Sequence, residues 1–232
     1  MSDKIDRLEE ALATVQGRIA AACRRAGRHP SEVRLIGVTK RVPGEEIEAA
    51  ARAGLTEFGE NYVQELAAKR EAAPDAVWHF VGRLQRNKVR RVLEAADVIQ
   101  TLEPGPATDR LAGLAADRGG SAECLVEVDF AGDRVGVTST EAEAFLDQLG
   151  RASGLAVRGL MTVPPLGQDP RPWFARLRDL RDRLATRFDG LSELSMGMSA
   201  DLEAAVEEGA TMVRVGTAIF GPRTPGPKGR RR

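Results

Sequence analysis

Eight short, mostly apolar runs with β-forming residues alternate with helix-forming segments along the chain. The runs cover 33–40, 57–61, 77–82, 97–103, 123–130, 157–164, 193–198 and 212–221. Strands that alternate with helices pair in parallel, and eight is the number that closes a TIM (β/α)8 barrel. The length of 232 residues is close to the roughly 250 that are typical of this fold. The sequence therefore predicts an α/β protein built as a TIM barrel.

The rest of the chain adds one helix and a tail to this core. A doubly wound open sheet is the competing arrangement, but no GxGxxG fingerprint follows the first run. Residues 2–27 place apolar side chains at steps of three and four, which predicts an extra N-terminal helix. We expect a single domain over residues 1–223 and a basic, disordered tail over 224–232.

Charge and hydropathy limit the expected partners and location. Lys and Arg together number 34, as do Asp and Glu, so no surplus of charge favours a nucleic-acid or membrane partner. The basic tail alone is weak evidence for a nucleic-acid contact. The first ten residues, MSDKIDRLEE, lack the apolar core of a signal peptide. No apolar run approaches the roughly 18 residues of a membrane span. We therefore expect a cytoplasmic protein.

Cysteine and histidine are too sparse to predict a metal site. The two cysteines, Cys23 and Cys124, lie far apart and form no CxxC pattern. In a reducing compartment they are expected to be small buried side chains. The two histidines, His29 and His79, belong to no His/Cys cluster. A dedicated transition-metal site is not expected.

Lys40 ends the first run, which reads RLIGVTK from Arg34. The carboxyl ends of the strands form the working face of a TIM barrel, so a lysine there is placed for chemistry. If Lys40 points into the barrel, Ile36 and Val38 also point inward and surround its stem with apolar groups. An amine that is partly desolvated in this way presents its lone pair to an aldehyde. The alternative is a lysine that caps the strand in water.

The segment SMGMSADLEAAVEEG, residues 195–209, joins the seventh run to a helix. Gly197 lets the backbone approach a ligand, and Ser199 is the expected N-cap of the helix. Hydroxyl and helix N–H groups at such a junction can hold an anion, although Ser199 taken alone is better explained as an ordinary N-cap. Asp201 and Glu203 would oppose a bound phosphate, so we expect them to face solvent.

Arg214 interrupts the last run, MVRVGTAIFG. An unpaired guanidinium is very costly to bury, and strand alternation places it on the same face as Gly216. Gly216 and Thr217 add backbone N–H groups and a hydroxyl. TIM barrels commonly bind phosphate with the loops after strands seven and eight, so these residues and Ser199 predict a phosphate site. A phosphorylated aldehyde with a ring nitrogen would engage this site, Arg214 and Lys40, and pyridoxal 5'-phosphate (PLP) is such a molecule.

Five stretches resemble the pyridoxal-phosphate homeostasis protein family, a stand-alone form of the barrel domain of alanine racemases. They read LIGVTK, FGENYVQE, WHFVGRLQRNK, GLMTVPP and SMGMSADLEAAVEEGATMVRVGTAIFG. The resemblance runs in the family's order from about residue 5 to residue 222, and the last stretch is highly specific. It implies a fold-type III PLP-binding barrel.

The resemblance also implies which residues meet the cofactor. Lys40 would hold PLP as an internal aldimine, and Arg214 would face the pyridine nitrogen. The other residues implied around the phosphate and ring are Asn61, His79, Met198, Ser199, Gly216 and Thr217. A helix-start residue is the alternative for Asn61, and a core histidine with satisfied hydrogen bonds is the alternative for His79.

Three positions depart from the family's pattern. Thr39 replaces the more usual serine before the lysine and keeps the hydroxyl. Arg83 and Arg86 stand where the family has histidine or a small polar residue, and they add positive charge near the third run. The sequence assigns them no role.

The implied function is a carrier that holds PLP reversibly and buffers it or delivers it to PLP-dependent apo-enzymes. Opposite Arg214, which is always protonated, the pyridine nitrogen accepts a hydrogen bond and stays neutral, which weakens carbanion chemistry. Alanine racemases add a tyrosine from a second domain as a second base, whereas the only tyrosine here is Tyr62 on the barrel. We therefore expect no enzyme. A racemase is the alternative, and a barrel for another phosphorylated metabolite is a third class.

Overall fold

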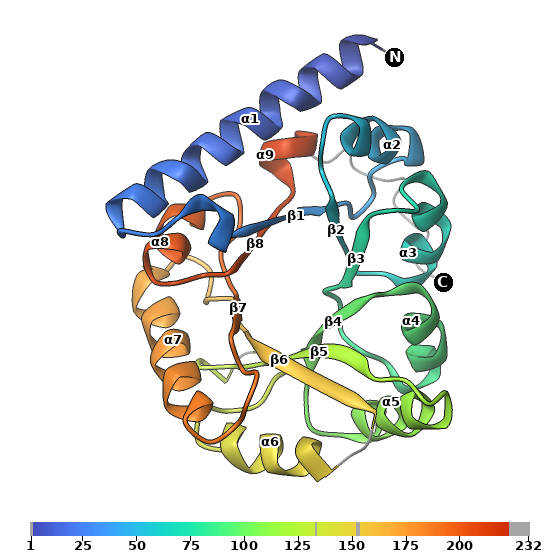
Figure 1. Cartoon of the computed structure of the whole chain (residues 1–232), viewed down its shortest axis with the longest axis vertical. Helices are drawn as coiled ribbons and strands as arrows, with labels where there is room; N and C mark the ends of the chain where they lie inside the picture. The colour runs from blue at the N-terminus through green and yellow to red at the C-terminus, as the bar shows by residue number, and fades with distance from the viewer. Residues whose placement is uncertain (1, 133, 152–153, 223–232) are drawn as a thin grey trace.

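Eight parallel strands close into a barrel in chain order, with β8 beside β1 (Figure 1). The computed structural model describes residues 2–132, 134–151 and 154–222. Helices surround the strands, so the predicted TIM barrel is confirmed and the open sheet is excluded. The tail over 224–232, which we expected to be disordered, lies outside the described residues.

The strands are short, and the helices between them vary in length. The strands are β1 (Arg34–Val38), β2 (Glu57–Glu60), β3 (Val77–Phe80), β4 (Val98–Leu102), β5 (Ala122–Glu127), β6 (Leu155–Met161), β7 (Glu193–Ser195) and β8 (Met212–Val215). The α-helices are α1 (Ser2–Arg25), α2 (Gly44–Arg52), α3 (Val63–Lys69), α4 (Val89–Ala95), α5 (Pro106–Asp117), α6 (Ala142–Arg151), α7 (Arg171–Ala185), α8 (Leu202–Glu207) and α9 (Thr217–Phe220). The described residues also form three 3-10 turns, η1 (Pro30–Glu32), η2 (Arg70–Ala72) and η3 (Arg86–Lys88). Across the described ranges, every helix is too short or too polar to span a bilayer.

Helix α1 lies outside the ring of strands and packs on α2, α8 and α9 (Figure 1). Gly27 takes a φ of 66° just past its end, a conformation that glycine adopts without strain. The extra N-terminal helix is therefore confirmed, and it covers the side of the barrel where α8 and α9 are short. Its buried side chains follow steps of three and four, as expected: Leu8, Leu12, Val15, Ile19 and Ala22.

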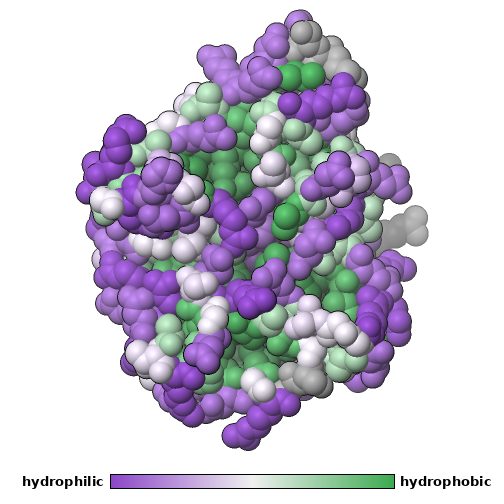
Figure 2. All heavy atoms as spheres, in the orientation of Figure 1, coloured by the Kyte–Doolittle hydropathy of each residue, from purple (hydrophilic) through white to green (hydrophobic). Residues whose placement is uncertain are grey.

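Within the part of the chain that the structure describes, two hydrophobic clusters stabilise the fold. The larger one joins the strands to the helices and includes Cys23 and Cys124, which are buried free thiols as expected. The smaller one lies inside the barrel and consists of Ile36, Leu125, Met161 and Met212. On the face seen in Figure 1, hydrophilic residues cover most of the surface, and hydrophobic ones show in the recesses between them (Figure 2).

The last strand is shorter than the sequence predicted. β8 ends at Val215, whereas the apolar run suggested a strand to residue 221. Residues 217–220 form the helical turn α9 instead, and the N–H of Phe220 donates a 2.9 Å hydrogen bond to the carbonyl of Gly216. α9 buries Ile219, so it needs apolar residues as a strand does, and a short apolar run cannot distinguish the two.

Candidate functional site

A cavity of about 400 Å³ opens at the carboxyl ends of the strands. This volume lies in the range of small-molecule sites, and this end of a TIM barrel is where ligands bind. All the predicted site residues except His79 line it: Lys40, Asn61, Met198, Ser199, Arg214, Gly216 and Thr217. Apolar parts of the wall come from Val38, Val81, Met161 and Val163.

Lys40 lies two residues past the end of β1 and is half-buried. Val38 lines the same cavity and Ile36 belongs to the cluster inside the barrel, so apolar side chains of β1 lie on the inner face that leads to Lys40. The Nζ of Lys40 lies 5.2 Å from the ring centroid of Tyr62, a cation–π distance. The amine therefore lies beside an aromatic ring, and the cavity that Lys40 lines has partly apolar walls.

A buried ion cluster holds the turn that carries Lys40. The Nζ of Lys69 donates to the carbonyl of Thr39 at 2.7 Å and to Oε1 of Glu60 at 2.5 Å. The hydroxyl of Thr39 donates to the same oxygen of Glu60 at 3.0 Å. The other oxygen of Glu60 accepts from the N–H of Asn61 at 2.9 Å. One carboxylate thus fixes the backbone before Lys40 and the start of the loop that carries Asn61.

Arg41, directly after Lys40, has a φ of 63°, which is uncommon for a residue other than glycine. Its N–H donates to Oε2 of Glu65 at 2.9 Å, and Lys69 donates to the same oxygen at 2.7 Å. Burial acts to raise the pKa of Glu65, but the hydrogen bonds from Lys69 and Arg41 lower it overall. The charged carboxylate therefore holds a strained backbone in place beside Lys40.

Arg214 is buried, and its guanidinium has two protein partners. Nη1 donates to the hydroxyl of Ser195 at 2.6 Å, and Nη2 donates to the carbonyl of Thr162 at 2.9 Å. Burial lowers the pKa of Arg214 to about 10, although the Glu127 carboxyl acts to raise it. The guanidinium stays cationic near neutral pH. Because Arg214 also lines the cavity, it presents positive charge to a ligand there.

Ser199 is not the N-cap of the following helix, which corrects the expectation. α8 begins at Leu202 with Asp201 as its N-cap, and Oδ1 of Asp201 accepts from the N–H of Met198 at 2.5 Å. Ser199 lines the cavity instead, and its Oγ accepts a long 3.4 Å hydrogen bond from the N–H of Ala218. This bond links the loops after β7 and β8, where the sequence predicted a phosphate site.

Helix α1 also reaches this loop. Arg18 donates from Nη2 to the carbonyl of Ser199 at 2.9 Å. It also contacts Glu203 through Nε at 2.6 Å and Nη2 at 2.8 Å. The hydrogen bonds from Arg18 lower the pKa of Glu203 and balance its charge. Asp201 and Glu203 are half-buried and bonded, whereas we expected them to face solvent.

His79 does not line the cavity, which corrects its expected place beside a cofactor. It is fully buried inside the barrel, where Nε2 contacts Oε2 of Glu57 at 2.8 Å and Nδ1 contacts Nε2 of Gln100 at 2.9 Å. The reason is its position within β3, two residues before Val81, which takes the place in the cavity wall. His79 is therefore a core histidine with satisfied hydrogen bonds, which was the alternative considered from the sequence.

Glu127 and Arg134 also line the cavity, but they were not predicted from the sequence. Glu127 ends β5 and is only 7% exposed. Burial raises the pKa of Glu127 to about 7, and the charges of Arg214 and Arg134 partly oppose this rise. An acidic residue within the apolar run 123–130 was the signal for Glu127. Arg134 follows in a loop, where no local pattern marks it.

Other features noted in the sequence lie away from the cavity. Arg83 is mostly exposed, and its Nε lies 3.3 Å from Oε1 of Glu103. Arg86 is exposed at the start of η3. Within the part of the chain that the structure describes, no group of three His, Cys, Asp or Glu side chains is arranged to hold a metal ion.

Comparison with known proteins places the chain in a family. It matches the family described as "Alanine racemase, N-terminal domain" over residues 12–224. It is 40% identical to the pyridoxal phosphate homeostasis protein of Aquifex aeolicus over 222 residues, which cover 92% of this chain and 97% of the relative. The chain belongs to the pyridoxal phosphate homeostasis protein family.

Solved structures support the same relationship. PipY of Synechococcus elongatus, solved with PLP bound, is 37% identical and superposes with a TM-score of 0.82. The match covers 92% of this chain and 100% of PipY. An alanine racemase from Clostridium difficile shares the fold at 14% identity and a TM-score of 0.75, with 95% of this chain matching 57% of the racemase. The chain thus corresponds in fold to the barrel part of that enzyme.

In this member of the pyridoxal phosphate homeostasis protein family, the cavity combines an amine, a buried cation and hydroxyl donors. Positive charge comes from Lys40, Arg134 and Arg214, against the single carboxyl of Glu127 among the lining residues. This balance suits an anionic ligand. Near the start of α9, the N–H of Ala218 donates to Ser199, and those of Ile219 and Phe220 donate to the carbonyl of Gly216. An aldehyde could react with the Lys40 amine, a phosphate could accept from the hydroxyl groups, and a ring nitrogen could accept from Arg214.

Proposed function

We propose that this protein binds PLP reversibly through Lys40 and acts as a carrier that buffers the cofactor or delivers it to PLP-dependent apo-enzymes. The observation that carries the proposal is the convergence of Lys40, Ser199 and Arg214 on one cavity. PipY, related over almost the whole chain, has been solved with PLP bound. The carrier would be a single domain over residues 1–223, and its cytoplasmic location stays a prediction from the sequence.

The predicted site residues that line the cavity each have a role in this proposal. PLP supplies an aldehyde that bonds reversibly to amines. Lys40 would provide that amine, since it lines the cavity with its Nζ beside the Tyr62 ring. Arg214 would donate to the ring nitrogen. The other contacts would come from Ser199, Gly216 and Thr217 at the phosphate and from Asn61 and Met198 at the ring.

An amino-acid racemase is the second candidate, and Glu127 is the observation that favours it. Racemisation needs a second base on the side of the ligand away from Lys40. Tyr62 contacts Lys40 itself, but Glu127 lines the cavity with a pKa of about 7. Against racemisation, Arg214 can only donate to the ring nitrogen, which leaves the ring a weak electron sink. We therefore propose a carrier that is not an enzyme.

Lys40→Ala tests the proposed bond. Wild-type protein mixed with PLP should show the absorbance band of the lysine-bound cofactor, and borohydride reduction should fix the cofactor to the peptide that contains Lys40. The variant should lose the band and the labelled peptide but keep its far-UV circular dichroism. Lys4→Ala is the matched control, because Lys4 pairs with Glu45 at the surface. A band retained by Lys40→Ala would refute the assignment, and a colourless wild type would favour another phosphorylated ligand.

Two further experiments separate a carrier from a racemase. Loaded protein is mixed with a PLP-dependent apo-enzyme, and activation of the apo-enzyme is compared with that by an equal concentration of free PLP. A carrier should activate it, whereas an enzyme that retains its cofactor should not. In deuterium oxide, exchange of an amino acid's α-proton should stay at the rate given by free PLP. Exchange at ordinary enzymatic rates that disappears in Glu127→Gln would establish the racemase instead.

A further inference from the structure

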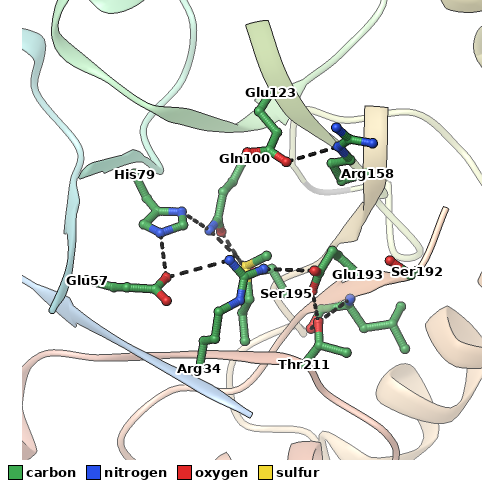
Figure 3. Close-up of polar contacts among 12 residues, drawn as sticks. Arg34, Glu57, His79, Gln100, Glu123, Arg158, Ser192, Glu193, Ser195 and Thr211 are labelled. Carbon is green, nitrogen blue, oxygen red and sulfur yellow. Dashed lines mark hydrogen bonds and ion pairs between the residues drawn. The ribbon is translucent and has the colours of Figure 1, made fainter. Parts of the chain in front are cut away.

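A chain of hydrogen bonds runs through the barrel interior beneath the cavity. It begins at Arg214, whose Nη1 lies 2.6 Å from Oγ of Ser195. Oγ of Ser195 lies 2.6 Å from Oε1 of Gln100, and Nε2 of Gln100 lies 2.9 Å from Nδ1 of His79. Nε2 of His79 lies 2.8 Å from Oε2 of Glu57 (Figure 3). The three middle residues, Ser195, Gln100 and His79, are termed the relay.

The relay is completely shielded from water. Its three side chains are each 0% exposed. TIM-barrel interiors are usually filled by branched apolar side chains, and buried polar groups cost free energy unless they are bonded. Apolar residues would therefore fill this space at a lower cost in free energy. The bonded polar atoms instead form one continuous series that ends at Arg214. Packing alone therefore does not explain why these three positions are polar.

Charged residues hold the far end of the chain. Oε2 of Glu57 lies 3.8 Å from Nη1 of Arg34, and Nη2 of Arg34 lies 2.9 Å from Oε1 of Glu193. The hydroxyl of Thr211 donates to the other oxygen of Glu193. Arg34, Glu57 and Glu193, labelled in Figure 3, are the first residues of β1, β2 and β7. They therefore lie at the end of the barrel opposite the cavity, which is at the carboxyl ends of the strands. The chain of hydrogen bonds thus runs from the Arg214 guanidinium at the cavity to the Glu57 carboxylate at the other end, where Arg34 balances the charge of Glu57.

The two ends fix the direction of every bond. A guanidinium can only donate, and a carboxylate can only accept. Arg214 donates to Ser195, so the Ser195 hydroxyl donates onward to Gln100. The Gln100 amide then donates to Nδ1 of His79, which carries no proton, and the Nε2–H of His79 donates to Glu57. Reversing the amide would require a proton on Nδ1 and would leave the Ser195 hydroxyl without this acceptor.

We propose that Ser195, Gln100 and His79 are positioning residues, which hold the Arg214 guanidinium against the ring nitrogen of PLP and transmit ligand binding to His79. The inference rests on the proposed function, because the ring nitrogen is the acceptor that Arg214 would meet. A new acceptor changes the bond from Arg214 to Ser195. Since hydrogen bonds in one chain polarise one another, the change passes through Gln100 to His79. His79 then responds to a ligand that it does not touch.

Nitrogen-15 NMR of the histidines tests this response. His29 and His79 are the only two histidines in the sequence, and His29 is exposed at η1, where it serves as an internal reference. In the PLP-free protein, His79 should carry its proton on Nε2. Addition of PLP should shift the Nδ1 resonance of His79 and leave both His29 resonances in place. Absorbance of the same sample shows that PLP has bound.

Gln100→Met breaks the relay but keeps an unbranched side chain of similar length. PLP should still bond to Lys40, with an affinity about tenfold weaker, as for the loss of a hydrogen bond that supports a charged group. It should no longer shift Nδ1 of His79. Thr101→Val is the matched control, because buried Thr101 of the same strand donates to the carbonyl of Gly82 at 2.6 Å and lies outside the relay. This control should keep the shift and the affinity.

The outcomes distinguish this inference from the proposed function. PLP binding that leaves His79 unmoved, or a shift retained in Gln100→Met, would overturn the inference alone. A proton on Nδ1 of His79 in the PLP-free protein would contradict the inferred donor–acceptor direction of these hydrogen bonds. Ser195→Ala, which should also lose the shift, replaces Gln100→Met if that variant does not fold. A wild-type protein that develops no PLP absorbance would defeat the proposed function and this inference together.

Discussion

The ammonium of Lys69 donates a 2.7 Å hydrogen bond to the carbonyl oxygen of Thr39, the residue immediately before Lys40. Lys69 ends α3 and is buried, and it also pairs with Glu60 and Glu65. The lysine that we propose bonds the cofactor therefore depends on a second lysine for its position. Because Glu60 and Glu65 both pair with Lys69, the positive charge of this second lysine is compensated within the protein.

Lys69→Met should destabilise the fold strongly. Methionine keeps the apolar stem but leaves the fully buried Glu60 carboxylate without its cation. Removing one partner of a buried ion pair costs about 3–5 kcal/mol, and we expect a loss of that size in the free energy of unfolding measured by urea denaturation. The PLP absorbance of the folded fraction should also weaken, because the turn at Lys40 loses its support.

Lys4→Met is the matched control for Lys69→Met. Lys4 pairs with Glu45 at the surface at 3.1 Å, and such pairs contribute at most about 1 kcal/mol. A double variant, Lys69→Met with Glu60→Gln, removes both buried charges and should recover part of the stability. Equal costs for Lys69→Met and Lys4→Met would show that the buried cluster does not support the turn.

Because the Thr39 hydroxyl donates to Glu60, we expect serine and valine at this position to change the stability of the fold by different amounts. Thr39→Ser keeps the donor to Oε1 of Glu60 and should cost only the buried methyl group, about 1 kcal/mol. Thr39→Val keeps the shape but removes a donor to a buried carboxylate, for which we expect a loss of about 1.5–3 kcal/mol. Thermal and urea denaturation of the two variants measure the difference. If Thr39→Val were as stable as Thr39→Ser, the hydroxyl of Thr39 would not contribute to the stability of the fold.

Arg18 should couple helix α1 to ligand binding. It bonds to the carbonyl of Ser199 and to Glu203, so Arg18→Met should loosen the loop after β7. We expect PLP affinity to fall about fivefold, equivalent to roughly 1 kcal/mol for an ion pair near the surface. Titration of the PLP absorbance band measures this change.

Arg25→Met provides the comparison on the same helix. Arg25 pairs with Glu207 of α8 at 2.7 Å, and Glu207 does not line the cavity. This variant should lose a similar amount of stability but bind PLP as the wild type does. An equal loss of affinity in both variants would mean that α1 acts through overall stability and not through Ser199.

The alternation of strands and helices was sufficient to predict the barrel and the cavity residues after strands one, seven and eight. Asn61 and Met198 were expected only from the resemblance to the family. Parallel strands bring their carboxyl ends to one face, so Lys40, Ser199 and Arg214 could be expected together from their places in the sequence. Arg214 was conspicuous because a charge within an apolar strand requires partners. Its partners, the Ser195 hydroxyl and the Thr162 carbonyl, could not be identified without the register of the neighbouring strands.

The remaining features depend on contacts that no local pattern encodes. His79 lies within β3 and Val81 directly after its end, on the same face, and only the stagger of the barrel decides which of them reaches the cavity. Lys69 resembles an ordinary lysine on an exposed helix face, yet it is buried because α3 places it beside the turn at Lys40. Asp201, not Ser199, caps α8, since the chain makes one more turn before the helix begins.

Glu127 should make the protein less stable as pH rises from about 4.5 to about 7. Burial raises the pKa of Glu127 from 4.5 to about 7 in the folded protein. Between these values the folded state holds a proton that the unfolded state has lost. The contribution of this group to stability is therefore complete below pH 4.5 and is lost as pH rises through about 7. At 1.36 kcal/mol for each pH unit, the loss amounts to roughly 3 kcal/mol.

Glu127→Gln isolates this effect, because it removes the titrating group and keeps its size. The free energies of unfolding of the two proteins, measured by urea denaturation across the same pH range, should differ little at the acid end. The difference should then open as pH rises, with the glutamine variant the more stable. A difference that stays constant would show that Glu127 ionises in the folded protein as it does in the unfolded chain. A difference that opened in favour of the wild type would mean that Arg134 and Arg214 stabilise the carboxylate by more than burial disfavours it.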